Sequence, residues 1–183
     1  FDHPHVIAGQ GTIGLEILED LPQIDMVLAG LSGGGLLGGI GLAIKDVLPE
    51  CQIIGVSMDQ GPAMIASLAA KQPIQVPEYS SLADSLGGGI GLQNQHSMDV
   101  IQRVMDRAYL VSDQAIANAM THFFQLEGLR LEGAAVVGLA ALAEHNIDIT
   151  GKNIVLVLSG CNVSDASFKL ARNMAATFVT KEY

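Results

Sequence analysis

The sequence is poor in aromatic and charged residues and has almost no cysteine. It contains no tryptophan, and aromatic residues make up 4% and charged residues 15% of its 183 residues. Its two cysteines, Cys51 and Cys161, cannot form a disulfide framework, which is consistent with a reducing cytoplasm. Apolar runs are too short to cross a bilayer, and the start at Phe1 has neither a basic nor an apolar leader region. We therefore expect a cytoplasmic protein that does not interact with membranes.

Basic residues are also scarce. Nine Lys and Arg stand against 19 Asp and Glu, which gives a formal net charge of -10. A field of this sign repels phosphate backbones, so we do not expect a nucleic-acid partner. An anionic ligand would need a local site built from backbone groups. The histidines show no metal-ligand spacing apart from the pair His3 and His5 at one terminus, and we assign no metal to them.

What the chain does have is a regular alternation of short apolar runs with helical patterns. We predict strands at 26–29, 52–56, 108–111 and 153–158, and helices at 36–47, 62–70, 98–105, 113–125, 133–143 and 165–177. The continuous apolar run 153–158 is typical of a strand buried on both faces. The pattern predicts one α/β domain over residues 1–183, a mainly parallel sheet with helices on both faces. Such sheets bind ligands at the carboxyl ends of their strands.

A glycine-rich segment, Ser32 to Leu36, follows the first predicted strand and opens a helix. The amides of Gly33, Gly34 and Gly35 carry no obstructing side chains, and the helix N-terminus adds a partial positive charge. Together these features predict a phosphate cradle. No lysine follows the glycines, so this is not the P-loop of nucleotide hydrolases. The alternative is a glycine turn that only packs a helix against the sheet.

Two further motifs could contribute to a site. The turn Ser159-Gly160-Cys161-Asn162 follows the predicted strand 153–158, and the Ser159 hydroxyl could bond to a heterocyclic nitrogen. The alternative is an ordinary capping turn. Glu132 begins a helix of small residues. It could be a carboxylate of the site, or it could simply be stabilised there by the helix dipole.

In order and spacing, these motifs resemble the fold-type-II pyridoxal-phosphate enzymes, in the branch of threonine and serine dehydratases and serine racemase. The segment 8–16, Ala-Gly-Gln-Gly-Thr-Ile-Gly-Leu-Glu, closely matches a stretch of that family. The resemblance implies pyridoxal 5'-phosphate as the cofactor, bound in the large cofactor-binding domain of a tryptophan-synthase-β-like fold. It assigns the cofactor phosphate to Ser32–Leu36 and the pyridine nitrogen to Ser159, with Glu132 lining the site. It also implies a homo-oligomer.

The reaction implied by this resemblance is loss of the β-hydroxyl from a small hydroxy amino acid such as threonine or serine, which gives a 2-oxo acid and ammonia. Within the family, the segments 55–58, 83–92 and 132–134 look most like the hydroxyectoine-utilisation dehydratases. The sequence departs from metal-binding members of the family, because Ser57 and Ala63 stand where carboxylates would be expected.

The main departure is the absence of the lysine that forms the Schiff base with the cofactor. In the family it lies in a Ser-x-Lys-x-Arg-Gly segment upstream of the glycine loop. The lysines of this chain, Lys45, Lys71, Lys152, Lys169 and Lys181, have no such context. We therefore expect an incomplete large domain, the downstream part, which contains no catalytic residue and is inactive alone.

Two other interpretations stay open at this point. One is a non-catalytic α/β module that holds a phosphate-bearing ligand. The other is a Rossmann-type nucleotide-binding domain, which needs an acidic residue after the second strand to hold a ribose. Asp59 is near that position, but its surroundings match the lyases better.

Overall fold

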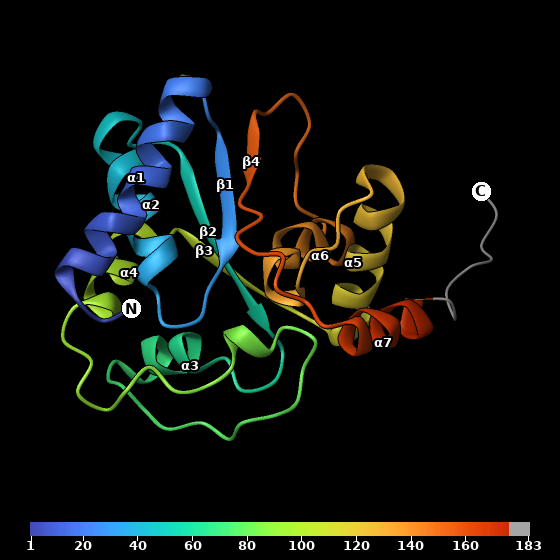
Figure 1. Cartoon of the computed structure of the whole chain (residues 1–183). Coiled ribbons are helices and arrows are strands. Elements are labelled where there is room, and N and C mark those ends of the chain that lie inside the picture. Colours follow the sequence, from blue (N-terminus) through green and yellow to red (C-terminus); the bar gives the residue numbers. More distant parts are fainter. Residues whose placement is uncertain (176–183) are drawn as a thin grey trace.

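A four-stranded parallel sheet forms the centre of the computed structural model, which describes residues 1–175 (Figure 1). The strand order is β3-β2-β1-β4. The strands are β1 (Met26–Gly30), β2 (Gln52–Met58), β3 (Arg107–Val111) and β4 (Ile154–Leu156). Every neighbouring pair is parallel, and in the register Val27 lies opposite Ile53 and Val155. The carboxyl ends of the strands therefore share one edge of the sheet, as the sequence predicts.

Helices cover both faces of the sheet (Figure 1). One face carries α1 (Pro4–Asp20), α2 (Gly35–Val47) and α4 (Ser97–Val104), and the other carries α5 (Asp113–Glu127), α6 (Val137–Glu144) and α7 (Asp165–Ala175). The short helix α3 (Ala63–Ala70) and the 3-10 turns η1 (Asp84–Leu86) and η2 (Gly133–Ala135) complete the order. Among the described helices, none is long and apolar enough to span a bilayer.

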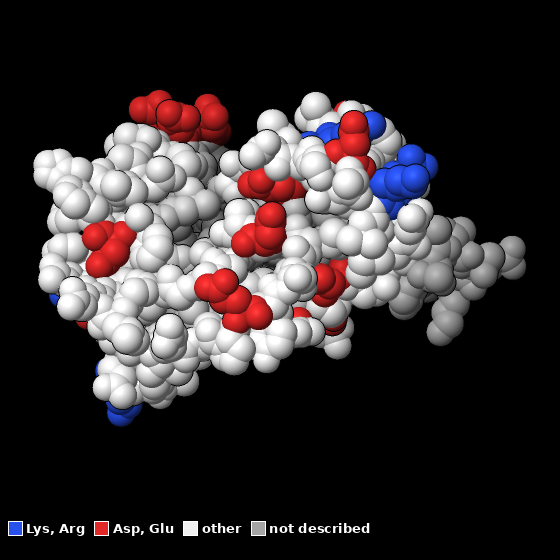
Figure 2. All heavy atoms as spheres, turned by 60° about the horizontal axis from the view of Figure 1, so that its bottom comes forward, with Lys and Arg blue, Asp and Glu red and all other residues white. Residues whose placement is uncertain are grey.

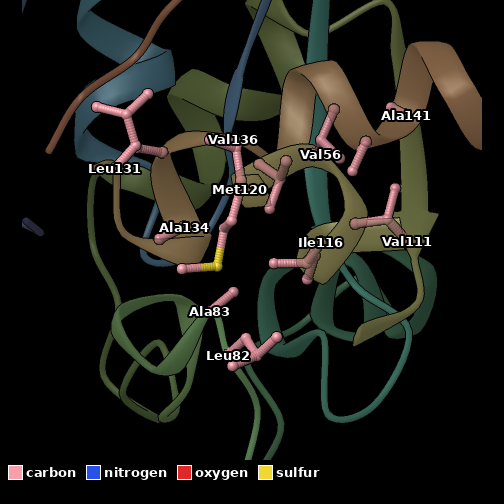
Figure 3. Packing of buried hydrophobic residues seen from close by; sticks show 14 of the residues in the cluster. Val56, Leu82, Ala83, Val111, Ile116, Met120, Leu131, Ala134, Val136 and Ala141 are labelled. Carbon is pink, nitrogen blue, oxygen red and sulfur yellow. The ribbon is translucent and has the colours of Figure 1, made fainter. Parts of the chain in front are cut away.

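Each face of the sheet has its own hydrophobic core. Val27 and Ile53 pack with Leu37 and Ile40 of α2 on one side. On the other side, Val56 packs with Ile116 and Met120 of α5 and with Val136 beside η2, as Figure 3 shows. Leu82 and Ala83, just before η1, belong to this second core, so both 3-10 turns are anchored to it.

Most predicted elements are confirmed within a few residues. The helix predicted at 113–125 is α5, and its cap is Ser112, whose hydroxyl accepts from the amide of Ala115 at 3.2 Å. The prediction for 153–158 was wrong in one respect: β4 is a short strand at the edge of the sheet, and its residues are half-buried. The predicted helix 133–143 is instead the 3-10 turn η2 followed by α6. Of the predicted helix 165–177, the last two residues lie outside the described residues.

Helix α1 was not predicted as a helix, because its glycines lower the local helix propensity. The structure shows what these glycines do. A Cβ on Gly11 would lie 3.2 Å from the carbonyl oxygen of Gly39, and one on Gly14 would lie 2.9 Å from that of Ile40. Close packing against α2 thus holds α1 in place.

Candidate cofactor site

The segment between β1 and α2 has the backbone geometry of an anion cradle. Gly34 is the N-cap of α2, with φ 87° in the left-handed region, and no side chain caps the helix there. The amides of Gly33 and Gly34 donate to no acceptor within residues 1–175. Unpaired amides at a helix N-terminus favour an anion, because the aligned peptide dipoles place partial positive charge there.

These glycines line a central pocket of about 280 Å³, in which all the predicted site residues meet. The lining residues are Phe1, Gly30, Ser32, Gly33, Gly34, Gly35, Leu36, Ser85, Leu86, Glu132, Ala134 and Ser159. Segments that are more than 120 residues apart in the sequence, those of Ser32 and Ser159, thus converge at the carboxyl ends of β1 and β4. The pocket does not depend on any single motif.

Glu132 is joined to the turn that carries Ser159. The amide of Glu132 donates to the carbonyl of Gly160 at 3.3 Å, and a Cβ on Gly160 would collide with the Glu132 carboxylate. Glu132 is the N-cap of the 3-10 turn η2 rather than the start of an α-helix. Its neighbours Leu131 and Ala134 are buried in the second core, so the backbone at Glu132 is held firmly (Figure 3).

Sequence reasoning missed several residues of the pocket wall. Phe1 is the most prominent, because its ring lies against the face of Gly33 where a side chain would otherwise be. Ser85 and Leu86 come from η1. In the sequence, only the family resemblance of the segment 83–92 pointed to this part of the chain. A lone Phe at a terminus carries no local signal, since its position depends on tertiary contacts.

The position of Phe1 is fixed by its neighbour Asp2. The Asp2 carboxylate accepts hydrogen bonds from the amides of Gln95, His96 and Ser97, each at 2.8 Å, at the start of α4. Partial burial acts to raise the pKa of Asp2, but these three amide donors outweigh it and lower the pKa below its usual value. This carboxylate therefore ties the beginning of the chain to α4.

None of the described lysines lines the central pocket. Lys45 is held by Asp106, with Nζ 2.8 Å from Oδ2, and Lys152 is held by Asp148 at 3.3 Å. Lys181 lies outside the described residues. The cysteines offer no alternative nucleophile here: burial raises the pKa of Cys51 to about 11, and Cys161 is exposed but is not among the residues that line the pocket.

The positions assigned to metal carboxylates by the family likeness do not fit a divalent ion. Ser57 is buried at the end of β2, and Ala63 begins α3. Within the part of the chain that the structure describes, no three His, Cys, Asp or Glu side chains could hold a metal ion together.

The charged side chains on the face of the molecule that includes the site are mostly acidic. Figure 2 shows several of them across the face that includes the carboxyl ends of the strands, with few basic side chains among them. Among residues 1–175, Glu132 is the only charged side chain that lines the central pocket. An anion held there would depend on backbone donors and on the dipole of α2.

Comparison with known families gives one match over most of the chain. The model of the family described as pyridoxal-phosphate dependent enzyme matches residues 1–160. A putative threonine dehydratase of Sinorhizobium fredii is 49% identical over 163 residues, covering 89% of this chain and 49% of that protein. An L-threonine ammonia-lyase of Thermotoga maritima is 38% identical over 163 residues, and the match covers 89% of this chain and 40% of that protein.

Solved structures show the same likeness. The processed form of threonine deaminase isoform 2 from Solanum lycopersicum has a TM-score of 0.86 and 28% identity, and the match covers 96% of this chain and 51% of that structure's chain. Maize serine racemase has a TM-score of 0.78 and 29% identity, covering 93% and 53%. The chain thus spans about half the length of the proteins that it matches.

Proposed function

Because the chain belongs to the pyridoxal-phosphate-dependent enzymes, of fold type II, we propose that it is the cofactor-binding part of a lyase acting on a small hydroxy amino acid. The products would be a 2-oxo acid and ammonia. The names of its relatives, threonine dehydratase and threonine ammonia-lyase, support this reaction. The observation that carries the proposal is the convergence of Ser32–Leu36, Glu132 and Ser159 on one pocket.

In this proposal the glycine loop holds the cofactor phosphate. The amides of Gly33, Gly34 and Gly35 supply donors that have no other acceptor within residues 1–175, and the α2 dipole favours the negative charge. No Lys, Arg or His among residues 1–175 lines the pocket, which fits this arrangement, because a chain of net charge -10 must hold an anion through fixed local donors.

Ser159 is proposed to face the ring nitrogen. A hydroxyl is a neutral donor, so Ser159 would leave that nitrogen largely unprotonated, which suits elimination of a β-group. Glu132, on a rigid backbone beside the Ser159 turn, lines the same pocket and would orient polar groups near the ring. The bound cofactor supplies the electron sink that makes the substrate's α-hydrogen removable.

The lysine that takes this proton must come from outside residues 1–175. None of the described lysines lines the central pocket, and Lys45 and Lys152 are engaged by acidic partners elsewhere. The share of this chain in catalysis is accordingly placement: it binds the phosphate, orients the ring and shields one side of the site with the Phe1 ring.

The test uses the full-length protein purified with pyridoxal phosphate. We expect an absorbance band of the lysine-bound cofactor and release of a 2-oxo acid from threonine or serine. Cofactor binding without turnover of any hydroxy amino acid would contradict the lyase and support the non-catalytic α/β module. That alternative is favoured only by the finding that none of the described lysines lines the pocket.

A finer assignment concerns the substrate. The segments 55–58, 83–92 and 132–134 look most like those of hydroxyectoine-utilisation dehydratases, and two of them supply Ser85, Leu86, Glu132 and Ala134 to the pocket. We propose a role in hydroxyectoine catabolism on this basis. Ratios of kcat/KM for threonine, serine and hydroxy amino acids derived from hydroxyectoine test it, and a preference for threonine would contradict it.

A further inference from the structure

A second pocket, lined by more basic than acidic side chains among the described residues, lies between α7 and the loop after α5. It has a volume of about 510 Å³ and is lined by Arg130, Asp165, Phe168, Lys169, Arg172 and Asn173. Three of the nine Lys and Arg of the chain meet here around a single carboxylate. This basic pocket shares no residue with the central pocket.

Arg130 is oriented at this pocket by a solvent-exposed salt bridge and by two aromatic rings. Its Nη1 lies 2.6 Å from an oxygen of Asp165, and its guanidinium lies over the rings of Phe168 and Phe124, 5.0 and 5.8 Å from their centroids. The two rings pack edge to face at 5.1 Å. The salt bridge occupies only one side of the guanidinium, so its other N–H groups stay available. A guanidinium held in this way loses little conformational freedom when it binds an oxyanion.

Lys169 and Arg172 add two cations from one face of α7, because residues three apart in a helix are neighbours on its surface. Neither makes a salt bridge within residues 1–175. Among the described residues, three cations and the carboxylate of Asp165 leave a local charge of about two positive units, whereas the whole chain is at -10. Asn173 supplies a further amide donor at the rim.

We propose that the basic pocket binds a phosphate group, either inorganic phosphate or a small phosphate monoester, independently of the cofactor site. A phosphate dianion matches the local charge, and the planar fork of an arginine pairs with two phosphate oxygens at once. The more ordinary role for Lys169 and Arg172 is to offset the helix dipole near the C-terminus of α7. That role predicts an effect on stability but none on phosphate binding.

The test is a calorimetric titration of the full-length, cofactor-loaded protein, in which the cofactor already occupies its own phosphate site. Inorganic phosphate and glycerol 3-phosphate are titrated in separate arms at constant ionic strength. We expect saturable binding in at least one arm, and the arm that binds more tightly identifies the source of the phosphate. The double variant Lys169→Gln, Arg172→Gln should weaken binding by about tenfold or more, since two charge-assisted hydrogen bonds are lost.

Two variants complete the design. Lys152→Gln removes a cation paired with Asp148 outside the basic pocket, and it should leave phosphate binding within about twofold of the wild type. Arg130→Lys keeps the charge but loses the planar fork, so it should weaken binding severalfold. Thermal melting and cofactor absorbance check that each variant is folded. No saturable binding by the wild type, or equal affinities in the wild type and the double variant, would overturn the proposal.

Discussion

The amide of Glu132 donates a hydrogen bond to the carbonyl of Gly160 at 3.3 Å, and this contact joins two of the three motifs of the central pocket. It brings the turn after β4 against η2, so that Ser159 and Glu132 face the same space. The approach is so close that a Cβ at position 160 would force the Glu132 carboxylate to move.

Gly160→Ala should therefore displace the side chain of Glu132. Because that side chain is flexible and lies at a pocket, we expect a small change in melting temperature but a clear loss of turnover in the full-length protein. Combining Gly160→Ala with Glu132→Ala should add little to the effect of Glu132→Ala alone, since both act on one group. Gly89→Ala, whose nearest non-neighbouring atom is 3.9 Å away, is the matched control. Additive losses in the double variant would contradict this explanation.

Gly34→Ala should weaken cofactor binding and also lower stability. The left-handed φ of 87° costs about 1–2 kcal/mol for a residue with a Cβ. In addition, that Cβ would lie 2.8 Å from Ile101 Cγ1 and 2.9 Å from Met64 Cε. A valine would be more disruptive, so alanine is the better probe. Gly128→Ala is the control, because Gly128 has a φ of 71° and an added Cβ would meet no atom within 4 Å. This variant introduces the same kind of backbone strain at a position outside the central pocket. It should lose stability and keep cofactor affinity, measured by fluorescence titration.

Ser159→Ala should weaken cofactor binding by about 1 kcal/mol, or roughly fivefold in Kd, as expected for one neutral hydrogen bond. Ser80→Ala, a serine that does not line the central pocket, serves as the control. Equal affinities in Ser159→Ala and the wild type would mean that the ring nitrogen faces another residue. The fluorescence titration used for Gly34→Ala measures this directly.

Asp2 should make stability depend on pH at acid pH. Because the three amide donors at the start of α4 lower the folded-state pKa, the carboxylate contributes its full stabilisation above its ordinary pKa. That contribution is lost as the pH falls through the lowered folded-state value. Asp2→Asn should cost about 1 kcal/mol or less near neutral pH, as for a capping residue. Urea unfolding of both proteins across pH 2 to 7 is the measurement, and the difference between them should shrink at acid pH. A difference that does not change with pH would exclude this role.

The 183-residue chain alone should show no dehydratase activity, because no described lysine lines the central pocket. The measurement is 2-oxo acid formation from threonine or serine with added pyridoxal phosphate, relative to free cofactor. Borohydride reduction followed by peptide mapping is the complementary experiment. A label on Lys45 or Lys169, or turnover well above the background, would show that a residue of this chain does the chemistry.

The alternation of apolar runs and helical patterns was sufficient to predict the parallel α/β sheet, whereas the grouping of the three motifs in one site was predicted from the family resemblance. Parallel strands end at one edge, and the pairing of β1 with β4 then brings Ser32 and Ser159 together at that edge. The edge position of β4 was not predictable, because an apolar run does not say how many neighbours its strand has. Helix α1 was missed because its glycines matter only through contact with α2.

The contact between Phe1 and the glycine loop offers an optical use. The chain contains no tryptophan, so Phe1→Trp would create a single indole fluorophore against Gly33, at the wall of the central pocket. Its emission overlaps the absorption of pyridoxal phosphate, and energy transfer would quench it as the cofactor enters. One substitution would thus turn the wall of the pocket into its own spectroscopic reporter, since residues 1–183 contain no other indole.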